Sequence, residues 1–564
     1  MRKIYFLLFS LSLALSLQAR ERTAEEMKQI ALSQLGLSAA TRSQSTDEVK
    51  QMYAADMLTI YGNDKAFVVV SKDTQFTPVL GYSDAPFDAE HLPTDFCWWM
   101  AQISASMRRG YQSDYVPSTR ATGDGTYLVK ALWGQESPYS DACPAVTGCV
   151  ATAMAQIMYY YGYPAIGTGT NCTYTYEGTT ETRSFNTTYE WDKMVDDYYN
   201  STVFLSKARK RAVANLMFDA GTAVHMQYSN SGSGAYTYDA AAAFVKNFSY
   251  DSLSVNMLNR FLYSDTEWMD IISKEITSGR PILYTGADSV AGGHAFIFDG
   301  LDGNGRVHIN WGWNGSANGF YSIADLSPGD TILASNLKYH FNVGQQMVIG
   351  LKNHAEADAE DSYHSQWCSD SLVVYSSAAK DSLTLELANL YNMDYQTFSG
   401  KILLLLINQT SNDTTAVELL DVNDHTTGTV GYGYGMSLRG KDGKVELQKF
   451  SLKDDLGLKA GTYKVCLASQ SDKQTVPTLF RVSGGESSAV FAYGADGTVT
   501  FNPTTGISSV RVNKPQPSDG TVRVYDASGR LVLTTTVSAY RSDDIPGHGL
   551  FIIRQGEKTQ KVVK

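Results

Sequence analysis

Cysteine is scarce in this chain of 564 residues, which contains six, at positions 97, 143, 149, 172, 368 and 466. So few cysteines cannot build the dense disulfide framework of small secreted domains. No C-x-x-C pair occurs, which argues against the common structural zinc motifs, and we expect neither a metal nor a cofactor. If Cys149 is free, five cysteines are left and they cannot all pair. Cys143 with Cys172 is the one disulfide we consider.

Clusters of positive charge are also few. The one short basic run is "KARKR" at residues 207–211, and the formal net charge is -12 with a pI near 5.3. This balance argues against nucleic acid or an anionic membrane surface as a partner. A calcium loop is not expected at the "DGNG" turn that starts at Asp302, because Arg306 stands where an EF-hand needs an oxygen ligand and no Glu closes the loop.

Long hydrophobic runs are confined to the N-terminus. Residues 1–19 combine a basic start, an apolar run from Ile4 to Leu17 and a small residue, Ala19, at a plausible cleavage point. This pattern is typical of a secretory signal peptide, since the run is too short to span a bilayer comfortably. No later stretch approaches 18 apolar residues. We therefore expect a secreted or cell-surface protein with no membrane span.

The remaining sequence divides at two polar linkers. Residues 20–120 carry helix and strand patterns of a compact α/β unit and run into the stretch "VPSTRATGDGT". Residues 121–348 mix amphipathic helices with strands. An acidic linker over 349–362 precedes purely β-patterned sequence, which predicts a β-sandwich over 363–500 and a small β unit over 505–564. The predicted fold class is α+β, followed by all-β domains.

One cysteine, Cys149, stands at the start of a predicted helix in "TGCVATAMAQIMYYYGYP", residues 147–164. Apolar residues between Val150 and Tyr161 recur at helical spacing, and Pro164 helps to end the helix. A free cysteine is often a small buried hydrophobe. A helix N-terminus, however, stabilises a thiolate, which a space-filling cysteine does not need. The position therefore makes Cys149 a candidate nucleophile.

A thiolate nucleophile needs a base or an ion-pair partner, and the chain has nine histidines. Six lie in the N-terminal unit, at a helix end, in the second linker or in the β-patterned sequence. His294 differs from these, because it opens a predicted strand in "GGHAFIFDG" behind two glycines that leave room for a substrate backbone. The alternative for this segment is a surface hairpin with a solvated histidine.

The second strand of this predicted hairpin carries Asn310. A hydrogen bond from Asn310 would fix the ring of His294, which is the third role beside nucleophile and base. A two-residue loop would place Asn310 opposite residue 297, on the wrong face of the sheet. We therefore expect a three-residue loop with a bulge, which would place Asn310 opposite residue 296 or 298.

Two further segments are candidates for the same site. Gln135, in "WGQESPYSDACP", supplies an amide that could join the backbone N–H of Cys149 in binding an oxyanion. The glycine-rich stretch "QYSNSGSGAY", residues 227–236, would either wall a substrate cleft or form an ordinary loop between helices.

Taken in order, "WGQESPYSDACP", "TGCVATAMAQIMYYYGYP", "MQYSNSGSGA", "GGHAFIFDG" and "HINWGWNGSANGFY" resemble the streptopain family of secreted cysteine peptidases. The resemblance covers residues 127–348, and the N-terminal unit resembles that family's inhibitory prodomain. It implies a papain-like fold of two lobes, with the chain's own prodomain as an inhibitor. The last unit resembles sorting domains of the type IX secretion route, which would make that machinery a partner.

The resemblance also implies residue roles. By motif position, Cys149 matches the nucleophile and His294 its ion-pair partner and general acid/base. Gln135 matches the oxyanion donor and Asn310 the residue that orients the histidine. The cleft residues that it implies are Trp311, as a shield beside the histidine, Trp313, Gly232, Ser233, Gly234 and Gly293. The family's preference suggests an apolar substrate residue two positions before the scissile bond.

The sequence therefore predicts a secreted cysteine endopeptidase, made as a zymogen, that acts on protein or peptide substrates. The alternative is a surface adhesin with a vestigial papain-like unit. No expected catalytic position is replaced, which favours the peptidase over the adhesin. Acyl transfer such as transglutamination would use the same chemistry and stays open. In the processed enzyme, we expect the pKa of Cys149 to lie well below the ~8.5 of a free thiol.

Overall fold

The computed structural model describes most of the chain between Arg20 and Val563. The predicted signal peptide, residues 118–124 of the first linker and residues 353–364 around the second lie outside the described residues. The described segments are 20–36, 48–117, 125–288, 292–326, 344–352, 365–369, 372–376, 380–387, 390–425, 435–436, 447–482, 485–486, 488–501, 510–511, 521–526, 531–536, 550–555 and 558–563.

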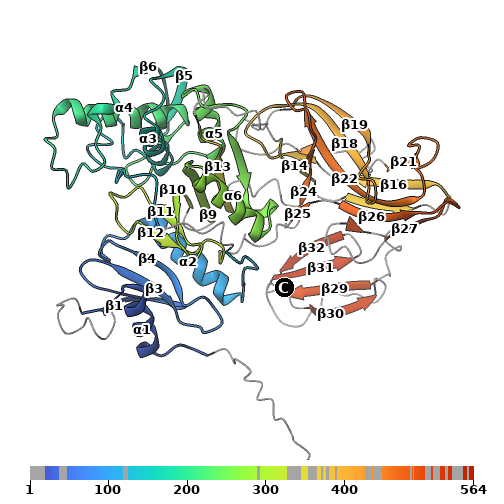
Figure 1. Cartoon of the computed structure of the whole chain (residues 1–564), viewed down its shortest axis with the longest axis horizontal. Helices are drawn as coiled ribbons and strands as arrows, with labels where there is room; N and C mark the ends of the chain where they lie inside the picture. Colours follow the sequence, from blue (N-terminus) through green and yellow to red (C-terminus); the bar gives the residue numbers. More distant parts are fainter. Residues whose placement is uncertain are drawn as a thin grey trace, which may run out of the picture.

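The N-terminal and central units share one antiparallel sheet of ten strands (Figure 1). The N-terminal unit contributes β1 (Lys50–Ala54), β2 (Leu58–Gly62), β3 (Phe67–Ser71) and β4 (Val79–Ser83). Strand β4 pairs with β12 (Gly319–Tyr321), which places Tyr82 opposite Phe320. The sheet continues, in spatial order, through β11 (Val307–Asn310), β10 (Gly292–Leu301), β9 (Ile282–Asp288), β13 (Gly344–Ile349) and β8 (Asn256–Asn259). Two units that are separate in the sequence are thus hydrogen-bonded to one another.

Helices cover this sheet on both faces. Helix α1 (Ala24–Gln34), which starts with a capping box between Thr23 and Glu26, packs on the meander of the N-terminal unit. Helices α2 (Thr94–Arg108) and α6 (Asp265–Thr277) share one core with the side chains of Phe296 and Phe298. Ala295 and Ile297, which point the other way because neighbouring residues of a strand alternate, belong to the core of the helical lobe.

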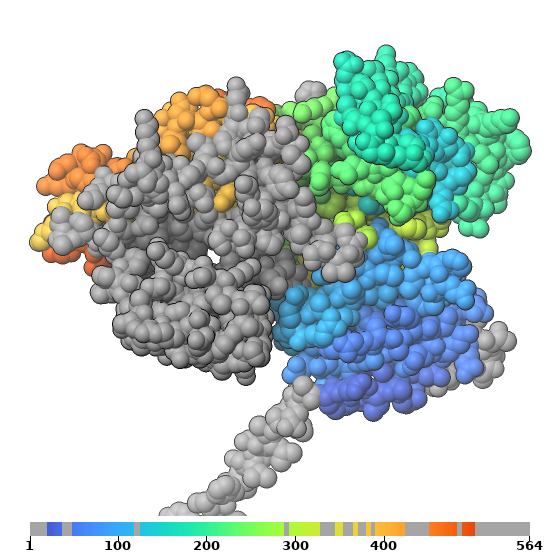
Figure 2. Space-filling model, turned by 180° about the vertical axis from the view of Figure 1, so that it is seen from behind, coloured from blue at the N-terminus to red at the C-terminus, as the bar shows by residue number. Residues whose placement is uncertain are grey.

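The helical lobe contains α3 (Cys149–Tyr161), α4 (Lys207–Ala223) and α5 (Thr237–Lys246). A small sheet completes it, with β5 (Ile166–Tyr176), β6 (Thr179–Thr188) and β7 (Gln227–Tyr228). Single turns of 3-10 helix occur at Trp191–Lys193 (η1) and Arg260–Leu262 (η2). Figure 2 shows the N-terminal unit packed directly against the central unit. The helical lobe and the sheet-containing lobe confirm the predicted papain-like α+β fold.

The described residues of the C-terminal part form β-strands and no helix, as predicted. One sheet contains β18 (Phe398–Asn408), β19 (Thr414–His425), β22 (Gly461–Ser471), β26 (Ser488–Tyr493) and β27 (Val499–Phe501), with β23 (Thr478–Leu479) beside β22. A second contains β14 (Trp367–Ser369), β17 (Leu390–Asn392), β20 (Gly435–Met436), β24 (Arg481–Val482) and β25 (Gly485–Glu486). A third contains β15 (Leu372–Ser376), β16 (Ser382–Leu387), β21 (Leu447–Ser451) and β28 (Val510–Arg511). The last unit is a sheet of β29 (Thr521–Asp526), β30 (Leu531–Thr536), β31 (Leu550–Gln555) and β32 (Lys558–Val563).

The C-terminal β-sandwich is docked on the central unit. The Gln366 side chain donates a hydrogen bond to Met257 O of β8 at 2.6 Å, and the Tyr395 hydroxyl donates to Val255 O at 3.1 Å. Arg481 pairs with Glu267 of α6 at 2.9 Å, and its guanidinium lies 4.1 Å from the ring centre of Tyr263. Because buried residues of both units share one hydrophobic core, the sandwich is part of the same packed body.

All six cysteines are free, so the disulfide considered between Cys143 and Cys172 is not formed. One expectation about the hairpin is wrong. Asn310 lies opposite Ile297 rather than residue 296 or 298, because the bulge of β10 falls between Phe298 and Gly300 and compensates the length of the turn. Within the described residues, no helix has the length and apolar character needed to cross a membrane.

Candidate active site

Cys149 is the first residue of α3, as predicted, and the residue before it must be glycine. Gly148 has a φ of 84°, a left-handed value that favours glycine. A Cβ at this position would lie 2.8 Å from the Met226 side chain and 2.9 Å from Ser233 O. The Thr152 hydroxyl donates to Gly148 O at 3.1 Å and is 2.8 Å from the Thr147 hydroxyl. The chain entering the helix is therefore held closely, and with it the thiol.

The Cys149 side chain is half-buried in this form of the protein, and its pKa is high rather than low. Loss of contact with water and, to a smaller extent, the negative charge of Asp95 raise the pKa of Cys149 to about 12. The backbone N–H groups of Ala295, Val150 and Cys149 itself act in the opposite direction, as expected at a helix N-terminus. Since burial outweighs them, Cys149 is a neutral thiol while the N-terminal unit is in place.

His294 does not hydrogen-bond with Cys149; it is held by a residue of the N-terminal unit. Its Nδ1 lies 2.7 Å from Oδ1 of Asp95, the second residue of α2, and both side chains are almost completely buried. Burial raises the pKa of Asp95, and the hydrogen bond with His294 lowers it. The other ring nitrogen, Nε2, is buried without a hydrogen-bond partner among the described residues. The imidazole is thus both occupied and oriented by Asp95.

Asn310 does not orient His294 in this structure, so that prediction is wrong for this form. Its side-chain NH₂ donates to Ala131 O at 2.8 Å and to Oε1 of Gln156 at 3.1 Å. Its carbonyl oxygen accepts from the Gly312 N–H at 3.1 Å. Cross-strand partners share a face of the sheet, so Asn310 lies on the face of Ile297, while His294 points to the opposite face.

Of the other predicted residues, Gln135 lies near the nucleophile, and the two tryptophans pack in the hydrophobic core. The loop of Gln135 lies beside Cys149, because Gln135 O accepts a hydrogen bond of 3.0 Å from the N–H of Thr147, two residues before the nucleophile. Contrary to the prediction, Trp311 does not line the cleft. Its ring is completely buried and packs on Phe96 of α2, and its indole N–H donates to Ala317 O at 2.8 Å. Trp313 is half-buried against the same core.

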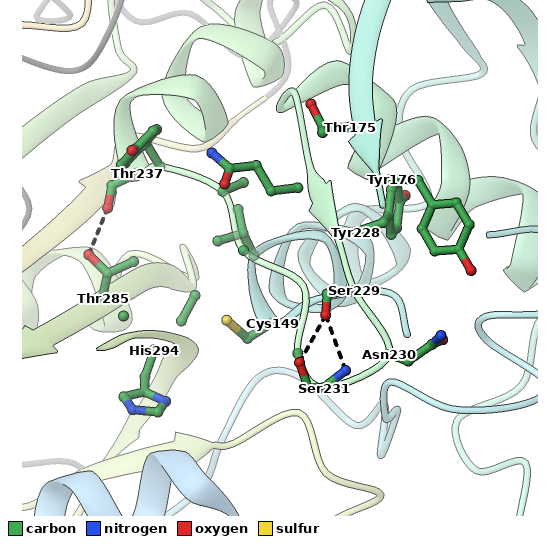
Figure 3. A pocket seen from close by; sticks show the side chains of 18 of the residues that line it. Cys149, Thr175, Tyr176, Tyr228, Ser229, Asn230, Ser231, Thr237, Thr285 and His294 are labelled. Carbon is green, nitrogen blue, oxygen red and sulfur yellow. Dashed lines mark hydrogen bonds between the residues drawn. The ribbon is translucent and has the colours of Figure 1, made fainter. Parts of the chain in front are cut away.

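A cavity of about 900 Å³ opens beside Cys149 and His294 (Figure 3). Gly232, Gly234 and Gly293 line it, as predicted. Ser233 turns inward instead, since its hydroxyl donates to Val146 O at 2.7 Å. The glycine-rich stretch is therefore a wall of the cleft, fastened to the residues that precede the nucleophile.

Sequence reasoning missed several residues of this site. Asp95 had no local signal, because it precedes an aromatic helix in the N-terminal unit and meets His294 only through the fold. The tip of the β5–β6 hairpin (Tyr176 to Gly178) and the threonines Thr237 and Thr285, whose hydroxyls are 2.8 Å apart, also line the cavity. No group of three or more His, Cys, Asp or Glu side chains is arranged to hold a metal ion in the described part of the chain.

Comparison with known proteins agrees with this geometry. Residues 133–321 match the family model described as the Peptidase C10 family. The thiol protease/hemagglutinin PrtT of Porphyromonas gingivalis is 31% identical over 391 residues, which cover 62% of this chain and 44% of PrtT, so the match spans less than half the length of that relative. Streptopain of Streptococcus pyogenes is 29% identical over 379 residues, which cover 59% of this chain and 92% of streptopain.

A solved fragment of Prevotella intermedia prointerpain A is 33% identical, with a TM-score of 0.48, and the match covers 55% of this chain and 99% of the fragment. The sequence matches extend over the segments that carry Cys149 and His294. The chain therefore belongs to the peptidase C10 family and is a cysteine-type peptidase.

Proposed function

We propose that the protein is a secreted cysteine endopeptidase made as a zymogen, with residues 20–120 as its inhibitory prodomain and residues 121–348 as the peptidase domain. The observation that carries this proposal is the contact between Asp95 and His294. A residue of the N-terminal unit occupies the imidazole that a thiol peptidase needs, and its charge also raises the pKa of the nucleophile. Both effects oppose catalysis and both end when the N-terminal unit leaves.

Release of Asp95 frees Nδ1 of His294 and lets the ring turn toward Cys149. The imidazole then takes the thiol proton, and the resulting ion pair is supported by the N–H groups at the start of α3. The thiolate attacks the carbonyl carbon of the scissile peptide bond. The backbone N–H of Cys149 and the amide of Gln135 stabilise the oxyanion that forms.

His294 completes the cycle as an acid and then as a base. It donates its proton to the leaving amine, so that the peptide bond breaks and an acyl-enzyme remains on Cys149. The neutral imidazole next takes a proton from water, whose oxygen attacks the thioester and releases the acid and the thiol. Asn310 orients the histidine in the processed enzyme, which requires His294 to change faces relative to this form.

The cleft supports a preference for an apolar residue two positions before the scissile bond. Val150, Ala235 and Ala295 are among the residues that line it next to Cys149. Trp313 would line the cleft on the leaving-group side once α2 has gone. Export would use the signal peptide 1–19, and the unit over 505–564 would engage the type IX secretion machinery.

The decisive experiment is casein digestion by the processed protein and by its Cys149→Ala variant. We expect complete loss of activity in the variant with unchanged folding by circular dichroism. Equal activity in both proteins would refute the assignment of the nucleophile.

A further inference from the structure

The tip of the β5–β6 hairpin is a fixed part of the cleft wall. Tyr176 pairs with Thr179, which leaves a turn of two residues, Glu177 and Gly178. Their φ values are 48° and 78°. Two positive φ values in a two-residue turn are the geometry that fits the twist of a tight hairpin. The backbone at Glu177 is therefore set by the turn.

A third strand fastens this tip to the glycine-rich wall. Strand β5 pairs in parallel with β7, so that Tyr176 lies beside Tyr228, and Thr175 N–H donates to Met226 O at 2.9 Å. Gln227 in turn exchanges backbone hydrogen bonds of 2.9 and 3.2 Å with Gly234. The hairpin tip and residues 227–234 thus form one continuous wall of the cavity.

Glu177 gives this wall a negative charge. It is the sole carboxylate among the described residues that line the cavity, and it is exposed. No ion pair with another described residue neutralises it. The one lining residue that can carry a positive charge is His294, which the reaction itself requires. An unpaired, well-placed carboxylate at the rim of a substrate cleft favours a positively charged side chain on the substrate.

The chemistry of the reaction tells which part of the substrate passes Glu177. His294 protonates the leaving amine, so the part of the substrate after the scissile bond leaves on the side of His294. The acyl part, bound to Cys149, extends the other way. Tyr176 and Tyr228 lie on the opposite side of Cys149 from His294 in Figure 3. The hairpin tip therefore faces residues that precede the scissile bond.

We propose that Glu177 is a specificity-determining residue that selects substrates with lysine or arginine three or more positions before the scissile bond. This inference rests on the proposed endopeptidase function. It adds a second requirement to the apolar residue at the nearer position.

The test uses the processed enzyme, with its C-terminal domains intact, and fluorogenic peptides that carry Lys, Gln or Glu at each of the third to fifth positions before the scissile bond. For the wild type, kcat/KM with Lys should exceed kcat/KM with Glu by about two- to five-fold at one of these positions, the range of an exposed ion pair. The ratio should fall toward one at high salt, because salt screens exposed charges. It should also fall toward one in Glu177→Gln.

Two further variants make the test specific. Glu181→Gln removes an exposed carboxylate from the same hairpin, on a residue that does not line the cavity, and should leave the ratio unchanged. Glu177→Lys should invert the preference in favour of Glu, a gain that misfolding cannot produce. An unchanged Lys-to-Glu ratio in Glu177→Gln would overturn the proposal. If the wild type cleaves none of the peptides and no casein, the proposed function fails instead.

Discussion

Asp95 and His294 are 199 residues apart in the sequence, yet Oδ1 of the carboxylate lies 2.7 Å from Nδ1 of the imidazole. The contact is enclosed: Asp95 is 1% exposed, and the Trp98 ring of the same helix lies 6.4 Å from the imidazole, between ring centres. An enclosed carboxylate–imidazole bond is stronger than one in water. In the proposed zymogen, the N-terminal unit would thus hold the imidazole of His294 in place as well as cover it.

Replacing the carboxylate of Asp95 should therefore speed activation. In Asp95→Asn, the charged partner of His294 is lost, and a charge-assisted hydrogen bond is worth about 1.5–3 kcal/mol. We expect the full-length variant to process itself about ten times faster than the wild type. Gel electrophoresis of samples taken over time measures this rate. Asp88→Asn is the matched control, because Asp88 pairs with His91 at 2.9 Å on the exposed surface. Equal processing rates in Asp95→Asn and wild type would show that the contact of Asp95 with His294 is unimportant.

The reactivity of Cys149 should depend on the prodomain. In the full-length protein the pKa of Cys149 is raised to about 12, so the thiol stays protonated, and alkylation by iodoacetamide should be slow from pH 5 to 9. Processing removes Asp95 and uncovers the site, both of which lower the pKa. The processed enzyme should then react at pH 5 to 6, with His294 as imidazolium beside the thiolate.

The His294→Ala variant is the control for this pH profile. Without the imidazolium, the processed variant should react only at higher pH. If the processed wild type also reacts only above about pH 8, Cys149 is an ordinary thiol and the catalytic assignment is wrong.

Cutting the first linker should not by itself separate prodomain and peptidase domain. Phe96 and Trp99 of α2 are completely buried, and β4 is hydrogen-bonded to β12. In a Cys149→Ala background with a specific protease site in place of residues 118–124, the two pieces should co-elute on size exclusion. Trp99→Ala, which removes a buried aromatic side chain at a cost of about 3–5 kcal/mol, should let them separate. Separate elution of the cut wild-type pieces would contradict this prediction.

In the processed wild type, the N-terminal sequence should begin within residues 116–126, the polar linker between the two units. A mature start well beyond Trp133 would remove Gln135 and contradict the proposed oxyanion site.

The docked β-sandwich should stabilise the peptidase domain. Arg481→Ala loses both the ion pair with Glu267 and the contact with Tyr263, which together amount to about 1–2 kcal/mol. The melting temperature should fall by a few degrees. Lys401→Ala removes an exposed ion pair with Glu418, which lies within the C-terminal β-sandwich. This variant should leave the melting temperature unchanged. Equal melting temperatures for all three proteins would mean that this contact contributes nothing.

Deleting residues 505–564 should separate secretion from catalysis. We expect the truncated protein to retain its activity on casein after processing, but to accumulate in the cell envelope. Fractionation of culture medium and cells measures this. Normal secretion of the truncated protein would count against a sorting role for the last unit.

The sequence was sufficient for those features that depend on local patterns. Cys149 starts a helix because helical spacing and a preceding glycine are both local, and the alternation of β10 follows from its apolar residues. The sequence was insufficient to predict contacts between segments that are far apart along the chain. The partner of His294 comes from α2, and the face of Asn310 depends on a bulge between Phe298 and Gly300 that the turn composition did not reveal. The hairpin tip at Glu177 reaches the cleft only because β5 pairs with β7.

The shared ten-stranded sheet has a consequence for the lifetime of the processed enzyme. While residues 20–117 are present, β12 is an interior strand with partners on both sides. Once they leave, β12 becomes an edge, with unpaired backbone groups that can recruit strands from other molecules and begin aggregation. Strand β12 spans only Gly319–Tyr321, and such a short edge offers few sites for an added strand. In the proposed zymogen, the N-terminal unit would cover this edge, and after processing its length of three residues would limit aggregation.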